Sequence, residues 1–212
     1  MGLTGMTNAI ELEAADITPI KDALQRLRWA LSEGRSNTYR LRRWSEFVRE
    51  RDGNRCVDCH SRRRLSAHHI CRKSFLKAAR FDTGNGITLC NDCHREAHSG
   101  FNGSPDLSLP MDAEGGEKLE IMERLYSILA TDAKERGTLC DDFYFISDDV
   151  LGRFKMFQGF DYFTPFPGCR LEQAFLIWAQ CSLNTRQAIA SANGFDLPRD
   201  PLMPGTAFII FA

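Results

Sequence analysis

The chain has 212 residues, a formal net charge of −1, 43% hydrophobic residues and 26% charged residues, values ordinary for a soluble globular protein. Its first residues show no secretory signal pattern, and the apolar end at 206–212 is too short to span a bilayer. We therefore expect one sizeable core with room for a second small module, a cytoplasmic location and no membrane partner.

The small net charge hides a strong asymmetry along the chain. Residues 35–80 carry fourteen lysines and arginines against four acidic residues, a local balance of +10, whereas residues 106–212 have a balance of −7. Such a basic block is the electrostatic footprint expected of a protein that binds a phosphate backbone. The alternative is a solvated, arginine-rich surface. We favour phosphate binding because the charge is concentrated where the candidate metal ligands lie.

Two helices are predicted in the first 54 residues. The first has Thr18 as its N-cap and Pro19 in its first turn, continues with apolar residues at helical spacing, and is ended by Gly34. The second covers residues 38–51. Its apolar face consists of Leu41, Trp44, Phe47 and Val48, and its polar side carries Arg42, Arg43 and Arg49. A turn at Asp52-Gly53 follows.

The next segment is predicted to form two short strands and one short helix. The strands cover residues 65–70 and 86–89, and residues 82–86 between them have the composition of a turn. Asn91 or Asp92 can cap a helix that carries two histidines and that Gly100 would end.

The C-terminal half is predicted to be mainly helical. After a linker at 101–116, helices are expected at 117–136 and 171–183. The aromatic-rich stretch at 143–166 lies among aspartates, so core packing is its expected role. Segment 184–195 faintly resembles half of a helix-turn-helix. We expect four parts, with boundaries at 1–38 (N-terminal helical segment), 39–100 (metal module), 101–116 (linker) and 117–212 (accessory region).

Four cysteines form two pairs with the spacing of zinc knuckles, Cys56/Cys59 and Cys90/Cys93. Zinc prefers four tetrahedral ligands, and two such pairs supply four thiolates with little strain. We therefore predict a structural Zn²⁺ site, with the segment between the pairs inserted into a zinc ribbon. The other cysteines, which are Cys71, Cys140, Cys169 and Cys181, are expected to be free thiols.

All five histidines lie between Cys56 and His98. His94 and His98 are four residues apart on one predicted helix, so their rings face the same way. His68 and His69 are adjacent on a predicted strand and point to opposite faces. One of these two can join His94 and His98 around a second metal, while the other, with a pKa near neutrality, can deprotonate water. The alternatives are additional zinc ligands or surface histidines. His60 follows a cysteine knuckle and is expected to be exposed and non-catalytic.

Residues 40–99 resemble the HNH endonucleases of the zinc-ribbon type. The resemblance rests on the run Cys56-x2-Cys59, Ala67-His68-His69-Ile70, Asn85-Gly-Ile-Thr-Leu-Cys90-x2-Cys93-His94-x3-His98, with Trp44 and Arg51-Asp52-Gly53 ahead of it. It implies an α+β, mostly helical fold: a ββα-metal finger with a four-cysteine zinc ribbon, N-terminal helices before it and a mainly helical C-terminal region after it. The double histidine is similar to the colicin-type branch, in which three histidines hold one divalent ion.

The resemblance also implies roles for individual residues. His69 is the expected general base and Asn85 holds the loop and orients it, while His68, His94 and His98 bind a catalytic Mg²⁺, Mn²⁺, Ni²⁺ or Zn²⁺. The expected reaction is metal-assisted hydrolysis of DNA phosphodiester bonds, giving a nick or a double-strand break. Residues expected to bind DNA phosphates are Arg62, Arg63, Arg64, Arg72, Lys73 and Arg80.

Three functions remain open on the sequence alone. The first is an independent DNA endonuclease, and the second is a non-catalytic, zinc-dependent nucleic-acid-binding module within a complex. The third is a nuclease subunit gated by another protein, as in bacterial antiviral defence or mobile-element systems. The complete histidine and asparagine set argues against the second. The acidic, aromatic C-terminal region fits a surface for a protein partner or for self-association.

Overall fold

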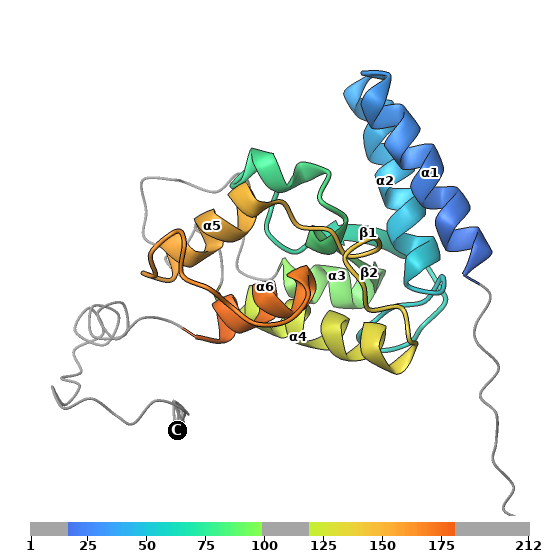
Figure 1. Ribbon diagram of the computed structural model, residues 1–212. Helices are drawn as coiled ribbons and strands as arrows, with labels where there is room; N and C mark the ends of the chain where they lie inside the picture. Colours follow the sequence, from blue (N-terminus) through green and yellow to red (C-terminus); the bar gives the residue numbers. More distant parts are fainter. Residues whose placement is uncertain (1–16, 99–118, 181–212) are drawn as a thin grey trace, which may run out of the picture.

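The computed structural model describes residues 17–98 and 119–180 (Figure 1). Within these ranges the chain is mostly helical, with one two-stranded antiparallel sheet, which confirms the predicted α+β class. None of the helices in these ranges has the length and apolar character needed to cross a membrane. The elements in chain order are α1 (Thr18–Ser32), α2 (Asn37–Arg51), β1 (Leu65–His69), the 3-10 turns η1 (Lys77–Arg80) and η2 (Thr83–Asn85), β2 (Gly86–Cys90), α3 (Asn91–Ala97), α4 (Leu119–Glu135), α5 (Asp148–Phe157) and α6 (Arg170–Ala179).

Helices α1 and α2 form an antiparallel pair that projects from the rest of the molecule (Figure 1). Pro19 lies in the first turn of α1, as predicted, but the N-cap is Ile17 rather than Thr18, with no side-chain capping bond. The Ser36 hydroxyl caps α2 by accepting a hydrogen bond from the Tyr39 backbone N–H. The buried face of α1 has the predicted helical spacing and consists of Ile20, Ala23, Leu24, Leu27 and Ala30.

The hairpin β1–β2 lies at the centre of the module and pairs Leu65 with Cys90 at one end and His69 with Gly86 at the other. Helix α2 packs across both strands. A Cβ atom at residue 86 would lie 2.6 Å from the Trp44 ring and 2.7 Å from Val48, so this position requires glycine for the close approach of α2. The strands end at His69 and Cys90, one residue away from the predicted ends.

Helix α3 begins directly after β2 and carries the last two histidines. Cys90 is its N-cap residue, so the predicted capping by Asn91 or Asp92 is wrong. His98 is the C-cap residue. Gly100, the predicted end of this helix, lies outside the described residues. Cys90, a member of the cysteine cluster, is therefore both the last residue of β2 and the residue that precedes α3.

Helices α4 and α6 match two predicted helices, whereas α5 falls within the stretch that the sequence analysis treated only as aromatic-rich. Core packing is confirmed for Phe143 and Phe154, which are buried. It is wrong for Phe145 and Phe163, whose exposed fractions are 43% and 83%. The predicted linker and segment 184–195 lie outside the described residues.

The described part of the C-terminal region shares one hydrophobic core with the metal module. Polar contacts reinforce this packing. Arg55 pairs with Asp132 of α4, and Arg124 of α4 pairs with Asp58 at 2.6 Å. Arg136 donates to the Arg51 carbonyl. Helix α4 is therefore packed directly on the segments that carry the cysteines and histidines, and α6 packs on α4 and α5.

Arg51, at the end of α2, is completely buried and links four segments of the chain. Its guanidinium donates to the carbonyls of Thr83 and Gly86, both at 2.6 Å, and pairs with the buried Asp52 at 2.8 Å. It also lies 4.1 Å from the centre of the Tyr144 ring. Asp52 accepts the Thr88 backbone N–H at 2.8 Å. This network fixes α2, the loop before β2, β2 itself and the segment after α4 relative to one another.

We expect Arg51→Met to lower the free energy of unfolding by about 3–5 kcal/mol, because it keeps the side-chain volume but leaves Asp52 as a buried charge without its closest partner. Urea unfolding of the full chain measures the effect. Arg49→Met, on the same helix and only partly buried, is the matched control, with an expected change of about 0.5 kcal/mol or less. Equal stability of the two variants would contradict the structural role of Arg51.

Candidate metal centres

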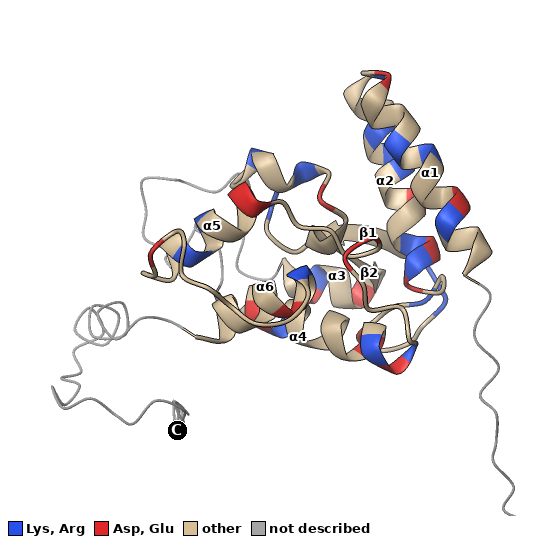
Figure 2. Cartoon of the chain, viewed as in Figure 1, with Lys and Arg blue, Asp and Glu red and all other residues tan. Residues whose placement is uncertain are grey.

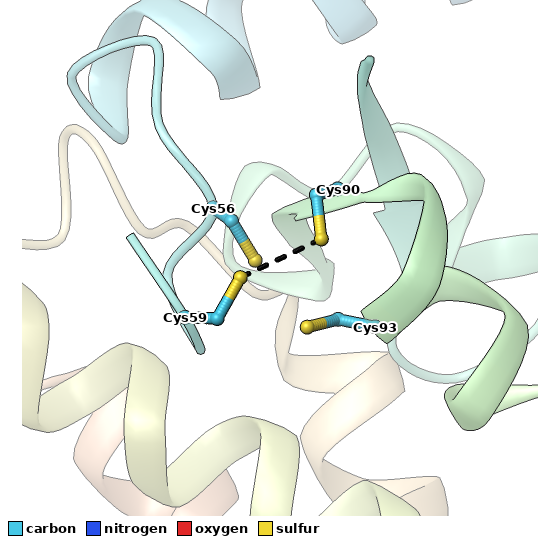
Figure 3. Close-up of side chains that lie close together, drawn as sticks. All are labelled: Cys56, Cys59, Cys90 and Cys93. Atoms are coloured by element: carbon cyan, nitrogen blue, oxygen red, sulfur yellow. Dashed lines mark hydrogen bonds between the residues drawn. The ribbon is translucent and has the colours of Figure 1, made fainter. Parts of the chain in front are cut away.

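The two cysteine pairs come together at one end of the hairpin. Cys56 and Cys59 lie in a turn after α2, held by hydrogen bonds from the His60 N–H to the Cys56 carbonyl and from the Cys56 N–H to the Ser61 carbonyl. Cys90 ends β2, and Cys93 lies in the first turn of α3. Figure 3 shows the four side chains converging from these two segments. Their sulfur atoms all lie within 4.8 Å of one another.

This cluster fits a zinc ion. A tetrahedral Zn–S bond of about 2.3 Å requires sulfur atoms about 3.8 Å apart, and the Cys59 and Cys90 sulfurs are 3.5 Å apart. A backbone hydrogen bond from Cys93 lowers the pKa of Cys90 to about 7. Burial raises the pKa of Cys93, since a thiolate is poorly solvated there. A cation at the centre would favour the thiolate form of all four.

Three histidines, one from β1 and two from α3, form a second cluster that is separate from the four cysteines. His68 comes from β1, and His94 and His98 come from α3, with ring centroids 4.7–5.0 Å apart in edge-to-face arrangements. One nitrogen from each ring lies within 4.8 Å of the others. Burial, followed by the charges of His94 and His98, holds the pKa of His68 well below its usual value. Neutral imidazoles are the form that binds metals.

The two clusters differ in the number of coordination positions that they would leave free on a bound metal ion. Four cysteines complete the tetrahedral shell of zinc, as in structural sites. Three histidines leave at least one coordination position for water or a substrate, as in catalytic sites. The structure thus brings together the predicted ligand sets in two separate groups, both able to hold a metal ion. His68, rather than His69, is the strand histidine that joins His94 and His98.

His69 lies apart from the three-histidine cluster and is held by two contacts. Its ring stacks on Trp44 with centroids 4.0 Å apart and an interplanar angle of 7°. Its Nε2 lies 2.9 Å from the Arg80 backbone oxygen. A carbonyl only accepts hydrogen bonds, so Nε2 carries the proton and Nδ1 keeps its lone pair. Nδ1 has no hydrogen-bond partner among the described residues. The ring is therefore fixed in the tautomer of a base.

The pKa of His69 differs from the near-neutral value expected from the sequence. Burial lowers it to about 4, with the charges of Lys73 and Arg80 acting in the same direction, whereas the hydrogen bond to the Arg80 carbonyl opposes them. The sequence could not reveal this shift because it arises mainly from the burial of the ring, which depends on the tertiary fold. An anion bound to Lys73 and Arg80 would offset the part of the shift that these two cations cause.

Trp44 is a residue of this centre that was predicted on the apolar face of a helix and in the lead-in to the family resemblance, but not among the site residues. It is buried, and its indole N–H donates to the Asp82 carbonyl at 3.2 Å. This bond, together with the close approach at Gly86, fixes the ring on which His69 stacks. The signal present in the sequence was the place of Trp44 ahead of the cysteine and histidine run on which the family resemblance rests.

Asn85 holds the loop after β1, as expected, and all of its side-chain hydrogen-bonding capacity is used in doing so. Its amide NH₂ donates to the carbonyls of Cys71 and Ala79, and its oxygen accepts the Cys71 N–H at 2.8 Å. The buried hydroxyl of Tyr126, on α4, donates to the same oxygen at 3.1 Å. Among the described residues, Asn85 makes no side-chain hydrogen bond to the His69 ring, and its bonds instead position the loop. The Tyr126 contact comes from the C-terminal region and was not predicted.

The loop that precedes β2 is also held from the C-terminal region. The Gly84 N–H donates to the Phe145 carbonyl at 2.8 Å, and the Phe145 N–H donates to the Thr83 hydroxyl at 2.9 Å. A carboxylate oxygen of Asp82 accepts hydrogen bonds from the N–H and the hydroxyl of Ser147. The segment between α4 and α5 is therefore part of the support of the candidate site.

The predicted phosphate-binding residues fall into two groups. Arg72 lies close enough to His68 and His98 for its charge to lower the pKa of both, and Lys73 and Arg80 do the same to His69. The other group, Arg62, Arg63 and Arg64, is exposed and precedes β1 at the Cys90 end of the hairpin. That end is about 13 Å from His69 along the strand. The structure therefore brings only the first group to the histidines.

The remaining histidine and cysteines are placed as follows. His60 is exposed, as expected, and its ring contacts Arg55. Cys71, Cys140 and Cys169 form no disulfide with the other described cysteines, and Cys181 lies outside the described residues. Comparison of the chain with protein-family models, with curated proteins and with solved structures finds no match.

Proposed function

We propose that this protein is a metal-dependent endonuclease of the HNH type that hydrolyses phosphodiester bonds in DNA. One observation carries the proposal: adjacent residues of β1 serve two different centres. His68 belongs to an open three-histidine cluster, whereas His69 is held as a single tautomer with an available Nδ1. A protein with only a structural zinc ion needs neither the three-histidine cluster nor a histidine held as a single tautomer, since the four cysteines already satisfy one ion.

Each residue of the centre has a chemical task in the proposed reaction. Nδ1 of His69 accepts a proton from water, the resulting hydroxide attacks phosphorus in line, and the bond from phosphorus to the leaving oxygen breaks. His68, His94 and His98 would hold a divalent ion, which would supply Lewis-acid stabilisation of the charge that develops on the phosphate. Arg72, Lys73 and Arg80 bind the phosphate oxygens, and Asn85 keeps the loop of Arg72 and Lys73 in position.

The proposed activity is tested by incubating the full chain with supercoiled plasmid and a panel of divalent metals. We expect nicked or linear product only when a divalent ion is present. His98→Ala should lower the cleavage rate more than about a hundredfold, because even residues that only support a metal ligand contribute about tenfold to a hundredfold.

His60→Ala is the matched control for His98→Ala, since it removes an exposed histidine outside both metal centres, and its cleavage rate should equal that of the unsubstituted chain. Absence of cleavage with every metal, while DNA binding persists, would contradict the endonuclease and favour a non-catalytic nucleic-acid-binding module. Equal rates for the two variants would remove the three-histidine cluster from the reaction.

A further inference from the structure

The projecting α1–α2 pair carries a cluster of arginines around two aromatic rings, far in sequence from the cations assigned to the candidate site. The Tyr39 ring lies edge-on to Trp29 with centroids 6.4 Å apart. Arg42 and Arg43 lie 5.2 and 4.9 Å from the Tyr39 ring centre, and Arg35 lies 5.3 Å from Tyr39 and 5.4 Å from Trp29. We call these five residues the hairpin patch, after the helical hairpin α1–α2, which is distinct from the β1–β2 hairpin.

The hairpin patch is on the surface and has an excess of positive charge. Trp29 has an exposed fraction of 48%, and Arg35 and Arg42 are exposed. Glu46 is the acidic residue that pairs with the patch, at 2.7 Å from Arg43 and 3.6 Å from Arg42. Arg35 has no acidic partner among the described residues. Three guanidinium groups gathered at one ring repel one another, and a bound polyanion would relieve that repulsion.

Two further basic residues, Arg40 and Arg80, lie on the path from the hairpin patch to His69. Arg40, on the same helix, lies over the Phe81 ring at 5.0 Å, beside Arg80, whose carbonyl holds His69. Trp44, one turn further along α2, stacks on His69. From Trp44 to Tyr39 is about 8 Å along the helix axis, which corresponds to two or three base pairs of DNA at about 3.4 Å each. Figure 2 shows basic residues at several positions along α2 in the projecting α1–α2 pair.

The aromatic rings of the hairpin patch are arranged to hold arginines rather than to stack on bases. Arg35, Arg42 and Arg43 all lie against Tyr39, and the Arg43 guanidinium also donates to the Tyr39 hydroxyl at 3.1 Å. Proteins that bind single strands instead leave aromatic faces open for successive bases. Pre-positioned guanidinium groups suit the phosphates of a duplex.

We propose that the hairpin patch binds the phosphate backbone of duplex DNA a few base pairs from the bond that is cut. The proposal rests on the proposed endonuclease function for the location of that bond. Arg35 and Arg42 contact phosphates, and Tyr39 is a positioning residue that keeps the arginines in one arrangement. The surface lets the enzyme hold its substrate outside the metal centre, with a contribution that does not depend on base sequence.

The test compares Arg35→Ala/Arg42→Ala with Lys134→Ala/Arg153→Ala, a control that removes the same charge from exposed residues elsewhere. Both are made in the full chain with His69→Ala, so that binding is measured without cleavage. Fluorescence anisotropy with a labelled DNA duplex is recorded across a salt series. The patch variant should lose about tenfold in affinity per arginine near 0.1 M salt, and its log–log salt slope should be shallower by about two.

Equal affinity and slope for the two double variants would overturn the hairpin patch as a DNA contact, as would absence of duplex binding or a loss confined to single-stranded DNA. The outcomes separate from those of the proposed function. Plasmid cleavage by the unsubstituted chain together with unchanged binding by the patch variant overturns only the patch. Patch-dependent binding by a chain that never cleaves supports the patch and overturns the endonuclease.

The positioning role of Tyr39 has its own readout. Tyr39→Phe keeps the ring under the arginines and should bind duplex DNA within about threefold of the parent chain. Tyr39→Ala removes the ring and should weaken binding several-fold while leaving the salt slope unchanged, because the same charges are present but less ordered. Equal binding by both variants would overturn the positioning role.

Discussion

Cys93→Ser is expected to give protein that is insoluble or rapidly digested by protease, because it removes one of the four thiolates of the zinc site. The module is built on a two-stranded hairpin, and such hairpins are only marginally stable alone. A structural zinc site contributes on the order of 10 kcal/mol, which is as large as the whole stability of a typical domain. Soluble yield, limited proteolysis and zinc content after dialysis against a mild chelator measure the effect.

Cys140→Ser is the matched control for that substitution, since it makes the same chemical change in a free thiol outside the cluster. It should remain soluble and retain the zinc held by Cys56, Cys59, Cys90 and Cys93. The same loss is expected for serine at each of the four positions. A quadruple serine variant that is folded, protease-resistant and free of zinc would contradict the structural role of this site.

The ligand sets could be predicted from the sequence because both depend on local geometry. Two cysteines separated by two residues, and two histidines separated by four on a helix, face one centre wherever the segment lies. The alternation of a strand separates His68 from His69, but it does not say which of them turns toward α3. That choice depends on how the hairpin packs between α2 and α3, and the structure assigns the ligand to His68.

The surroundings of the site could not be predicted, because they are contacts between distant parts of the chain. Arg51 was predicted only as the last residue of the second helix, yet it is buried against segments 32 and 92 residues further along the chain. Tyr126 reaches Asn85 from a helix that the sequence analysis placed in an accessory region. No periodicity marks such residues, because their burial depends on polar partners that lie far away in the sequence.

The helix starts show a second limit of local signals. Serine, threonine, aspartate and asparagine are favoured as N-caps, and this preference predicted Thr18 and Asn91 or Asp92. The structure has Ile17 and Cys90 as the N-cap residues of these helices instead. Cys90 takes that position with its sulfur in the four-cysteine cluster, so the geometry of this cluster outweighs the capping preference. Helix α5 was missed because the whole stretch 143–166 was interpreted by its aromatic content, although the helix itself, Asp148–Phe157, contains only Phe154 and Phe157 as aromatic residues.

His69→Ala is expected to lower the rate of DNA cleavage by about two to four orders of magnitude, the usual contribution of a general base. The reason is geometric: the Arg80 carbonyl fixes the proton on Nε2, and the Trp44 stack fixes the plane of the ring, so Nδ1 is the available base. Single-turnover cleavage of a labelled duplex measures the rate. Metal content should be unchanged, because His69 belongs to neither cluster.

Trp44→Phe separates the base itself from its positioning. It keeps an aromatic ring beneath His69 but loses the indole hydrogen bond to Asp82, so we expect a rate loss smaller than that of His69→Ala, with the same metal content. If His69→Ala cleaves within about tenfold of the unsubstituted chain, His69 is not the base. If instead His69→Ala loses the metal held by His68, His94 and His98, its effect on cleavage reports an indirect change in the ligand cluster, and the assignment of the base is wrong for that reason.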